Sequence, residues 1–202
     1  MRDERVGVLA LQGGYQRHID CLDRLAIESR LVRCAADLEE CTALILPGGE
    51  STSMTRLIEA RGLLDALTGF AQTHPVLGTC AGLILMARSD DDRVASLGLL
   101  DVRVERNAYG RQTHSFRTDI PIELEAMSIF SAVFIRAPRI VACGPGVDVL
   151  ARHDGMPVLV AQGRHMGMSF HPELTGDPRV HAEWLRRARV PSRETALRQV
   201  SA

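Results

Sequence analysis

The chain has 202 residues, of which 46% are hydrophobic and 24% charged, a composition typical of one globular domain with a full core. Its formal net charge is −1 and its basic residues form no run, which argues against a nucleic-acid-binding protein. The apolar stretches are too short to cross a membrane as helices. The composition therefore favours one globular domain that neither binds nucleic acid nor crosses a membrane with helices.

The start of the chain and its cysteines indicate a cytoplasmic protein. Residues 1–14 lead directly into a strand-like apolar segment and lack the features of a signal peptide. The five cysteines show no paired spacing and form no CxxC motif, which is typical of reduced thiols in the cytosol. They are Cys21, Cys34, Cys41, Cys80 and Cys143.

The first half of the chain predicts strands that alternate with helices. Apolar runs typical of strands occupy residues 6–11, 29–34, 43–46 and 75–80. Helical patterns occupy residues 15–26, 51–60, 63–72 and 81–88, and the segment 51–60 opens with Ser and Thr as candidate N-caps. This alternation predicts a parallel sheet that is covered on both faces.

The second half predicts strands with little helix between them, followed by one closing helix over 177–189. We expect these strands to join the same sheet, some of them antiparallel. The predicted fold is a single α/β domain over residues 1–190, with a mixed, mostly parallel sheet, helices on both faces, and a polar tail at 191–202. The expected strands cover 99–106, 114–123, 132–138, 147–154, 157–163 and 165–170.

Cys80 stands in "GTCAG", where a predicted strand turns into a helix. Ligands of open α/β sheets bind beyond the carboxyl ends of the strands, so a thiol on this turn is exposed at the functional edge. Gly78 and Gly82 leave room for a tight turn, and the helix that starts near Ala81 directs its positive end at the sulfur. Position alone leaves open a buried structural cysteine and a nucleophile.

A thiol nucleophile needs a base, and "SFHPE" at 169–173 supplies His171 and Glu173. Pro172 favours extended geometry at His171, so the two side chains should point to the same side. Glu173 could then bind one imidazole nitrogen while the other faces Cys80. An isolated HPE is usually the end of a strand, but together with the cysteine the catalytic interpretation is favoured.

The segment "LPGGES" at 46–51 follows another predicted strand. Two consecutive glycines allow the backbone to approach a ligand and to present N–H groups to an oxyanion. The same pattern is also a simple strand stop followed by a helix cap, and the sequence of this segment does not separate the two.

Together these motifs resemble the class I glutamine amidotransferases, which have a Cys turn, a distant HPE and a PGG loop. Further stretches resemble one branch of the family, the glutaminase subunit of the two-protein pyridoxal 5′-phosphate synthase. The matching stretches run from residue 6 to about 185. They are "LQGG" (11–14), "LPGGEST" (46–52), "GTCAGLIL" (78–85), "VERNAYGRQ" (104–112), "FIRAP" (134–138) and "SFHPELT" (169–175).

The resemblance implies a role for each matching residue. Cys80 would be the nucleophile, His171 the base and Glu173 the residue that orients it. The implied glutamine-binding residues are Gly48, Gly49, Glu50, Arg106, Ile135 and Arg136. Gln12 and Ala81 would lie near the oxyanion site, with Gln12 also at the partner interface. An arginine is a natural bidentate partner for the substrate carboxylate.

The resulting hypothesis is an enzyme that hydrolyses L-glutamine through a γ-glutamyl thioester. It would deliver ammonia to a synthase subunit that makes pyridoxal 5′-phosphate, and it would need no cofactor and no metal. The alternatives are the glutaminase of another amidotransferase pair, a non-catalytic glutamine-binding regulatory module, and a stand-alone cysteine hydrolase. Residues 104–112 argue against the first, and the complete Cys-His-Glu set argues against the second.

Overall fold

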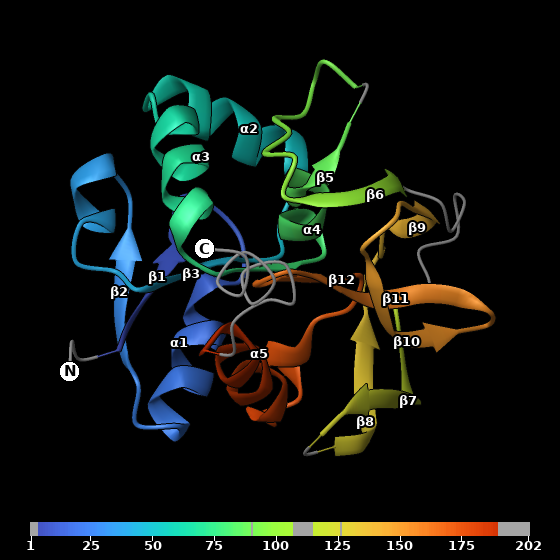
Figure 1. The fold of residues 1–202 in the computed structure, drawn as a ribbon. Helices are drawn as coiled ribbons and strands as arrows, with labels where there is room; N and C mark the ends of the chain where they lie inside the picture. Colours follow the sequence, from blue (N-terminus) through green and yellow to red (C-terminus); the bar gives the residue numbers. More distant parts are fainter. Residues whose placement is uncertain (1–3, 90, 107–114, 126, 190–202) are drawn as a thin grey trace, which may run out of the picture.

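The computed structural model describes residues 4–89, 91–106, 115–125 and 127–189. A nine-stranded sheet crosses the molecule, with strands in the order β2-β1-β3-β4-β12-β11-β10-β7-β8. The first five of these strands run parallel to their neighbours, and from β12 to β8 every pairing is antiparallel. The expected α/β domain with a mixed sheet is confirmed, and the antiparallel part is as wide as the parallel part (Figure 1).

The central strands of the parallel part, β1, β3 and β4, are buried on both faces. Every residue of β3 and β4 is buried, and so is nearly all of β1, as expected for strands that helices cover on both sides. The parallel strands are β1 (Arg5–Leu9), β2 (Glu28–Val32), β3 (Ala43–Leu46), β4 (Val76–Thr79) and β12 (His165–Met168).

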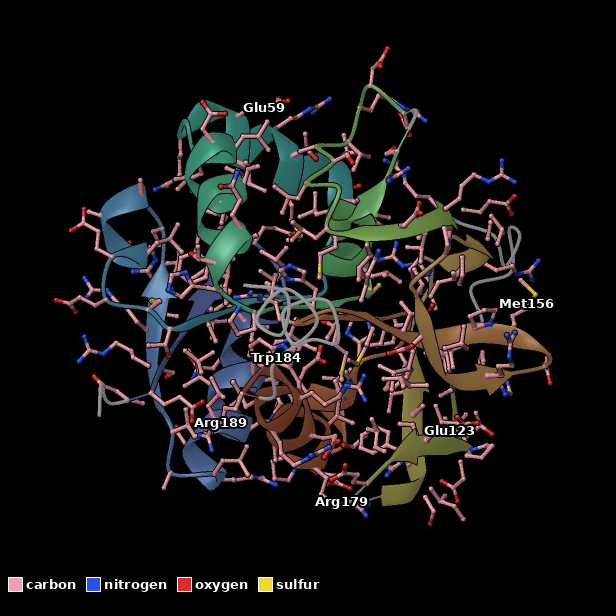
Figure 2. The ribbon with its side chains drawn as sticks, in the orientation of Figure 1. Glu59, Glu123, Met156, Arg179, Trp184 and Arg189 are labelled. Carbon is pink, nitrogen blue, oxygen red and sulfur yellow. The ribbon has the colours of Figure 1, made fainter. Side chains whose placement is uncertain are left out.

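Helices cover the two faces of this part (Figure 1). α1 (Tyr15–Arg24) and α5 (Arg179–Arg189) lie on one face, and α2 (Ser51–Ala60), α3 (Leu64–Thr73) and α4 (Ala81–Met86) lie on the other. Trp184 of α5 is fully buried between its helix and the sheet (Figure 2). Each face therefore has its own apolar core.

The antiparallel part carries the remaining strands of the large sheet. β7 alternates exposed and buried residues along most of its length, the pattern of a strand with one solvent-facing side. These strands are β7 (Phe116–Leu124), β8 (Met127–Phe134), β10 (Asp148–His153) and β11 (Met156–Gln162).

Three strands form a separate small sheet, which the prediction of one sheet did not foresee. β5 (Ala87–Arg88), β6 (Leu100–Glu105) and β9 (Arg139–Cys143) pair in the order β5-β6-β9 and pack against β11 and β12. The expected helix over 81–88 ends at Met86 because the chain turns there into β5. β9 was not predicted, since its sequence follows the "RAP" turn without an alternating pattern.

Two short 3₁₀ helices complete the described structure, η1 (Ala35–Leu38) and η2 (Pro172–Leu174). None of the helices in the described residues has the length and apolar character that a bilayer crossing requires. The predicted tail at 191–202 lies outside the described residues.

The turn between β4 and α4 depends on close packing of backbone against backbone. A side chain at Gly82, in the first turn of α4, would overlap the backbone carbonyl of Leu46 at the end of β3. The first turn of α4 can therefore lie directly against the neighbouring strand only because residue 82 has no Cβ.

We predict that Gly82→Ala lowers the free energy of unfolding by about 1–3 kcal/mol, because the added methyl group collides with backbone that cannot move aside. Urea unfolding followed by circular dichroism measures this change. Gly69→Ala in α3 is the matched control, since nothing lies within 4 Å of a Cβ there. It should leave stability unchanged or raise it by roughly 0.5–1 kcal/mol. Equal stability of the two variants would contradict the packing argument.

Candidate active site

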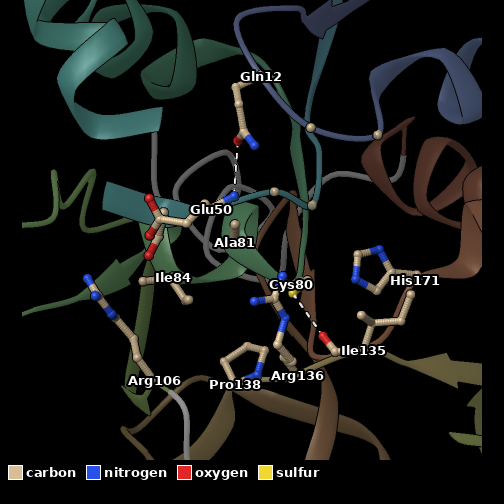
Figure 3. A pocket seen from close by; sticks show the side chains of 15 residues that line it. Gln12, Glu50, Cys80, Ala81, Ile84, Arg106, Ile135, Arg136, Pro138 and His171 are labelled. Atoms are coloured by element: carbon tan, nitrogen blue, oxygen red, sulfur yellow. Dashed lines mark hydrogen bonds between the residues drawn. The ribbon is translucent and has the colours of Figure 1, made fainter. Parts of the chain in front are cut away.

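The carboxyl ends of four parallel strands converge on one cavity. The chain leaves β1 toward Gln12, β3 toward Gly48, β4 at Cys80 and β12 toward His171, and all four residues line a cavity of about 300 Å³ (Figure 3). This is the edge at which open α/β sheets bind ligands. The full lining is Gln12, Gly13, Gly14, Gly48, Gly49, Glu50, Ser51, Cys80, Ala81, Ile84, Arg106, Ile135, Arg136, Pro138 and His171.

Cys80 adopts a backbone conformation that residues with a side chain rarely occupy. Its φ is 49° and its ψ −102°, and it precedes the first residue of α4. The Cys80 N–H donates to the Met168 carbonyl at 2.9 Å, which ties the turn to the neighbouring strand β12. The sulfur lies 3.9 Å from the Ile135 carbonyl oxygen (Figure 3). This strained strand-to-helix turn is the geometry of a nucleophile elbow.

His171 and Glu173 form a close pair on the turn after β12. His171 Nδ1 lies 2.7 Å from Glu173 Oε1. The sequence predicted an extended segment here, and this was wrong for residue 173: Pro172 begins the 3₁₀ turn η2, which curls Glu173 back under the imidazole. The Glu173 side chain is buried behind His171, outside the cavity lining.

The charge state of His171 follows from its two partners. Burial alone would lower the pKa of His171, but hydrogen bonds to Cys80 and Glu173 and their negative charges raise it to about 10. Burial likewise favours the neutral form of Glu173, yet the hydrogen bond from His171 and the positive charge of that ring hold the pKa of the carboxyl below its usual value. At neutral pH the pair is therefore an imidazolium held by a carboxylate.

The PGG loop is held by the loop that follows β1. The Gly14 N–H donates to the Gly48 carbonyl at 2.9 Å, and the Glu50 N–H donates to Gln12 Oε1 at 3.0 Å (Figure 3). A side chain at Gly48 would overlap the His171 ring, so the loop can pass this close to the imidazole only with glycine there. Two hydrogen bonds thus set the position of the PGG backbone beside the catalytic candidates.

Glu50 is also the N-cap of α2, where Ser or Thr was predicted. Its carboxylate accepts hydrogen bonds from the backbone N–H groups of Thr52 and Ser53 at 2.9 and 2.7 Å. The hydroxyl of Ser53 and these N–H groups lower the pKa of Glu50 to about 2. The rim of the cavity therefore keeps a negative charge at neutral pH.

Two arginines stand at the cavity. Arg106 at the end of β6 is held by Asp91, with 3.4 Å between Nη1 and Oδ2, and by Thr52, with 3.3 Å between Nη2 and Oγ1. Arg136 is exposed and follows Ile135 with a φ of 42°. Both arginines line the cavity, and the Arg106 side chain points toward Glu50 (Figure 3).

Residues 8–190 of the chain match the SNO glutamine amidotransferase family. The chain belongs to this family. Among its relatives is the pyridoxal 5′-phosphate synthase subunit PdxT of Oenococcus oeni, 49% identical over 178 residues that cover 88% of this chain and 93% of the relative. The PdxT subunit of Thermus thermophilus is 49% identical over 189 residues, which cover 92% of this chain and 98% of that one.

Solved structures of other proteins share the fold. A crystal structure of a glutamine amidotransferase superposes with a TM-score of 0.84 at 45% identity, covering 92% of this chain and 99% of the other. The structure of PurLQS from Thermotoga maritima gives a TM-score of 0.69 at 15% identity, covering 93% of this chain and 98% of that one, which shows the fold alone. The expected class I amidotransferase-like architecture is thereby confirmed.

The structure of this family member brings the predicted site residues together. All of them line the cavity except Glu173, which supports His171 from behind. Residues 107–112 of the predicted "VERNAYGRQ" motif lie outside the described residues. Five further cavity residues were not predicted individually, although each of them lies within one of the sequence motifs quoted above. Their position in those motifs is the feature of the sequence that could have identified them. They are Gly13, Gly14, Ser51, Ile84 and Pro138.

We predict that Glu173→Gln lowers the pKa of His171 by roughly 1–3 units, because the charge that opposes the effect of burial is removed. NMR titration of histidine-labelled protein measures this pKa directly. Asp154→Asn is the matched control: Asp154 lies 3.6 Å from another histidine, His153, on the surface. That control should leave His171 unchanged. An unaltered His171 titration in Glu173→Gln would show that the carboxylate does not set its charge.

Proposed function

We propose that this chain is a glutaminase that hydrolyses the side-chain amide of L-glutamine. The observation that carries the proposal is the series Cys80, His171 and Glu173 at one sheet edge, with the sulfur on a strained turn and the imidazole held by a buried carboxylate. This is the arrangement of an activated thiol nucleophile, its acid–base partner and the group that orients that partner.

In the proposed reaction the Cys80 sulfur attacks the amide carbon as the thiolate, which a neighbouring imidazolium favours. The oxyanion that forms would accept hydrogen bonds from the backbone N–H of Ala81, the first residue of α4, and from an N–H of the PGG loop. His171 then gives its proton to the amide nitrogen, and ammonia leaves a γ-glutamyl thioester. The same imidazole takes a proton from water, which attacks the thioester and releases glutamate.

The cavity walls fit the amino-acid end of the substrate. Arg106 and Arg136 offer guanidinium groups to the α-carboxylate, a pairing that can be bidentate. The Ile135 carbonyl can accept a hydrogen bond from the α-ammonium group. The negative charge of Glu50 attracts the same group. Gly48 and Gly49 let the substrate pass close to the backbone.

We further propose that the ammonia is handed to a synthase subunit that makes pyridoxal 5′-phosphate, with no cofactor or metal in the glutaminase. The support is the identity of 43–49% to proteins named as PdxT subunits of pyridoxal 5′-phosphate synthase, over about nine-tenths of the chain. A cytoplasmic location belongs to the same proposal, since all five cysteines are free thiols.

We predict that a glutamine analogue with an electrophilic side chain, such as a chloro-isoxazoline, labels Cys80 alone. L-glutamine should protect it and D-glutamine should not. Peptide mapping by mass spectrometry identifies the labelled residue. Cys34 provides the control because it is exposed: a general alkylating reagent should modify Cys34, and Cys34→Ser should still take up the analogue. Labelling at any other cysteine would contradict the assignment.

We predict that glutamine hydrolysis rises at least about tenfold when the synthase subunit is added. The Gly48–Gly49 peptide can rotate at low steric cost, and one oxyanion donor is worth roughly 10²–10³ in kcat. In this structure the Gly48 carbonyl accepts a hydrogen bond from the Gly14 N–H. The N–H of the same peptide, which belongs to Gly49, therefore points away from Gly14. A partner docked on the Gln12 loop could change that orientation.

Gln12→Ala should weaken the response to the synthase, because it removes the acceptor for the Glu50 N–H. Cys80 should still react with small thiol reagents in this variant. Coupled assays of glutamate release, with and without the synthase, measure both effects. Full turnover by the isolated chain, unchanged by the synthase, would exclude the switch and favour a stand-alone hydrolase. Glutamine binding without turnover in either state would favour a regulatory module.

A further inference from the structure

A fully buried histidine of α1 connects the carboxylate behind the cavity to the strand that bears the cysteine. His18 Nε2 lies 3.6 Å from Glu173 Oε2 and 3.3 Å from the Thr79 hydroxyl oxygen. Its other ring nitrogen, Nδ1, lies 2.9 Å from Nε2 of His181 on α5. α1 and α5 lie on the same face of the sheet (Figure 1), and the two rings make an edge contact between these helices, with 5.2 Å between their centroids.

The protons on these two rings can be placed from their surroundings. Burial lowers the pKa of His18, and burial together with His18 lowers the pKa of His181 to about 3, so both rings are neutral. A lone pair on His18 Nε2 would face the negative carboxylate of Glu173, which is unfavourable. The Nε2–H tautomer instead directs a donor at Glu173 Oε2 and Thr79, and His18 Nδ1 then accepts from the Nε2–H of His181.

Glu173 Oε2 needs such a donor. Glu173 is 3% exposed, His171 is bound to its Oε1, and no group in the described part of the chain makes a standard hydrogen bond to Oε2. His18 Nε2 faces this oxygen at 3.6 Å. A buried carboxylate oxygen without a donor is costly and is free to turn away or to take up a proton.

We propose that His18 is a positioning residue: its Nε2–H holds the Glu173 carboxylate toward His171, and His181 fixes the tautomer that makes this possible. The proposal rests on the function proposed above, in which His171 and Glu173 work as a pair. His18 does not line the cavity, so its proposed role involves no contact with the substrate.

The other titratable groups around His18 do not replace it. Burial and the charge of Glu173 raise the pKa of the Cys21 thiol on the same helix to about 11, so this thiol stays neutral. His171 is cationic and is already bound to Oε1. Asp177 acts on His181, opposing the effect of burial on that ring. His18 is thus the neutral donor that faces the second carboxylate oxygen.

The first test uses the unaltered chain. Two-dimensional NMR of ¹⁵N-histidine-labelled protein distinguishes the two neutral tautomers and the imidazolium of each ring. We expect His18 and His181 both as neutral Nε2–H tautomers at pH 7. A proton on Nδ1 of His18, or a doubly protonated His18 ring, would overturn the proposal whether or not any variant folds.

The second test compares His18→Gln with His18→Met. Glutamine keeps an N–H donor near the position of Nε2, whereas methionine fills similar space without a donor. In complex with the synthase, His18→Met should lower kcat for glutamine about tenfold or more, the loss expected for a hydrogen bond to a charged group, with KM unchanged. The pKa of the Glu173 carboxyl, followed by ¹³C NMR, should rise by about one unit. His18→Gln should restore both values toward those of the wild type.

His165→Met is the matched control, because His165 is a partly buried histidine at the other end of β12. It should change neither kcat nor the Glu173 pKa. Equal losses of kcat in His18→Met and His18→Gln, with an unchanged Glu173 pKa, would mean that His18 only fills space. Absence of glutamine turnover in the wild-type complex would instead refute the proposed function, and the tautomer and the Glu173 pKa would still decide the role of His18.

Discussion

The backbone turn at Cys80 is the constraint on which the rest of the site depends. Cys80 has a positive φ, which costs free energy in a residue with a side chain. Interactions with the surrounding structure have to offset this cost. Here the Cys80 N–H is held by Met168 of β12, and Gly82 lets α4 lie against the end of β3. The sulfur is thereby presented at the sheet edge by three neighbouring elements rather than by a mobile loop.

The pairing of β4 with β12 then determines that His171 lies near the Cys80 sulfur. Thr79 and Met168 are paired in this parallel ladder, so the chain leaves both strands at the same level of the sheet. Cys80 follows one strand at once, and His171 follows the other after two further residues. The register of one strand pair thus brings together residues that lie 91 positions apart in the sequence.

Much of this could be predicted from the sequence, because the decisive signals are local. Apolar runs followed by glycine predicted the ends of β3 and β4, and the small residues around Cys80 predicted the turn. The 3₁₀ turn at Glu173 was missed because Pro172 fits both an extended segment and the first position of a helical turn. Glu50 replaced Ser or Thr as the cap because its side chain reaches the same N–H groups. The separate small sheet depends on long-range pairing that no local pattern encodes.

The position of β12 has a consequence for how the chain reaches its native state. β12 is the last strand in chain order, yet it lies in the middle of the nine-stranded sheet, between β4 and β11. While the ribosome is still synthesising the C-terminal part, β4 has an open hydrogen-bonding edge, and α5 does not yet cover its part of the sheet. Pairings of such long sequence separation form slowly and leave strand edges free to aggregate. A nascent chain that ends before residue 165 therefore contains Cys80 but not His171. The open edge of β4 is the part of such a chain that a chaperone would have to protect from aggregation.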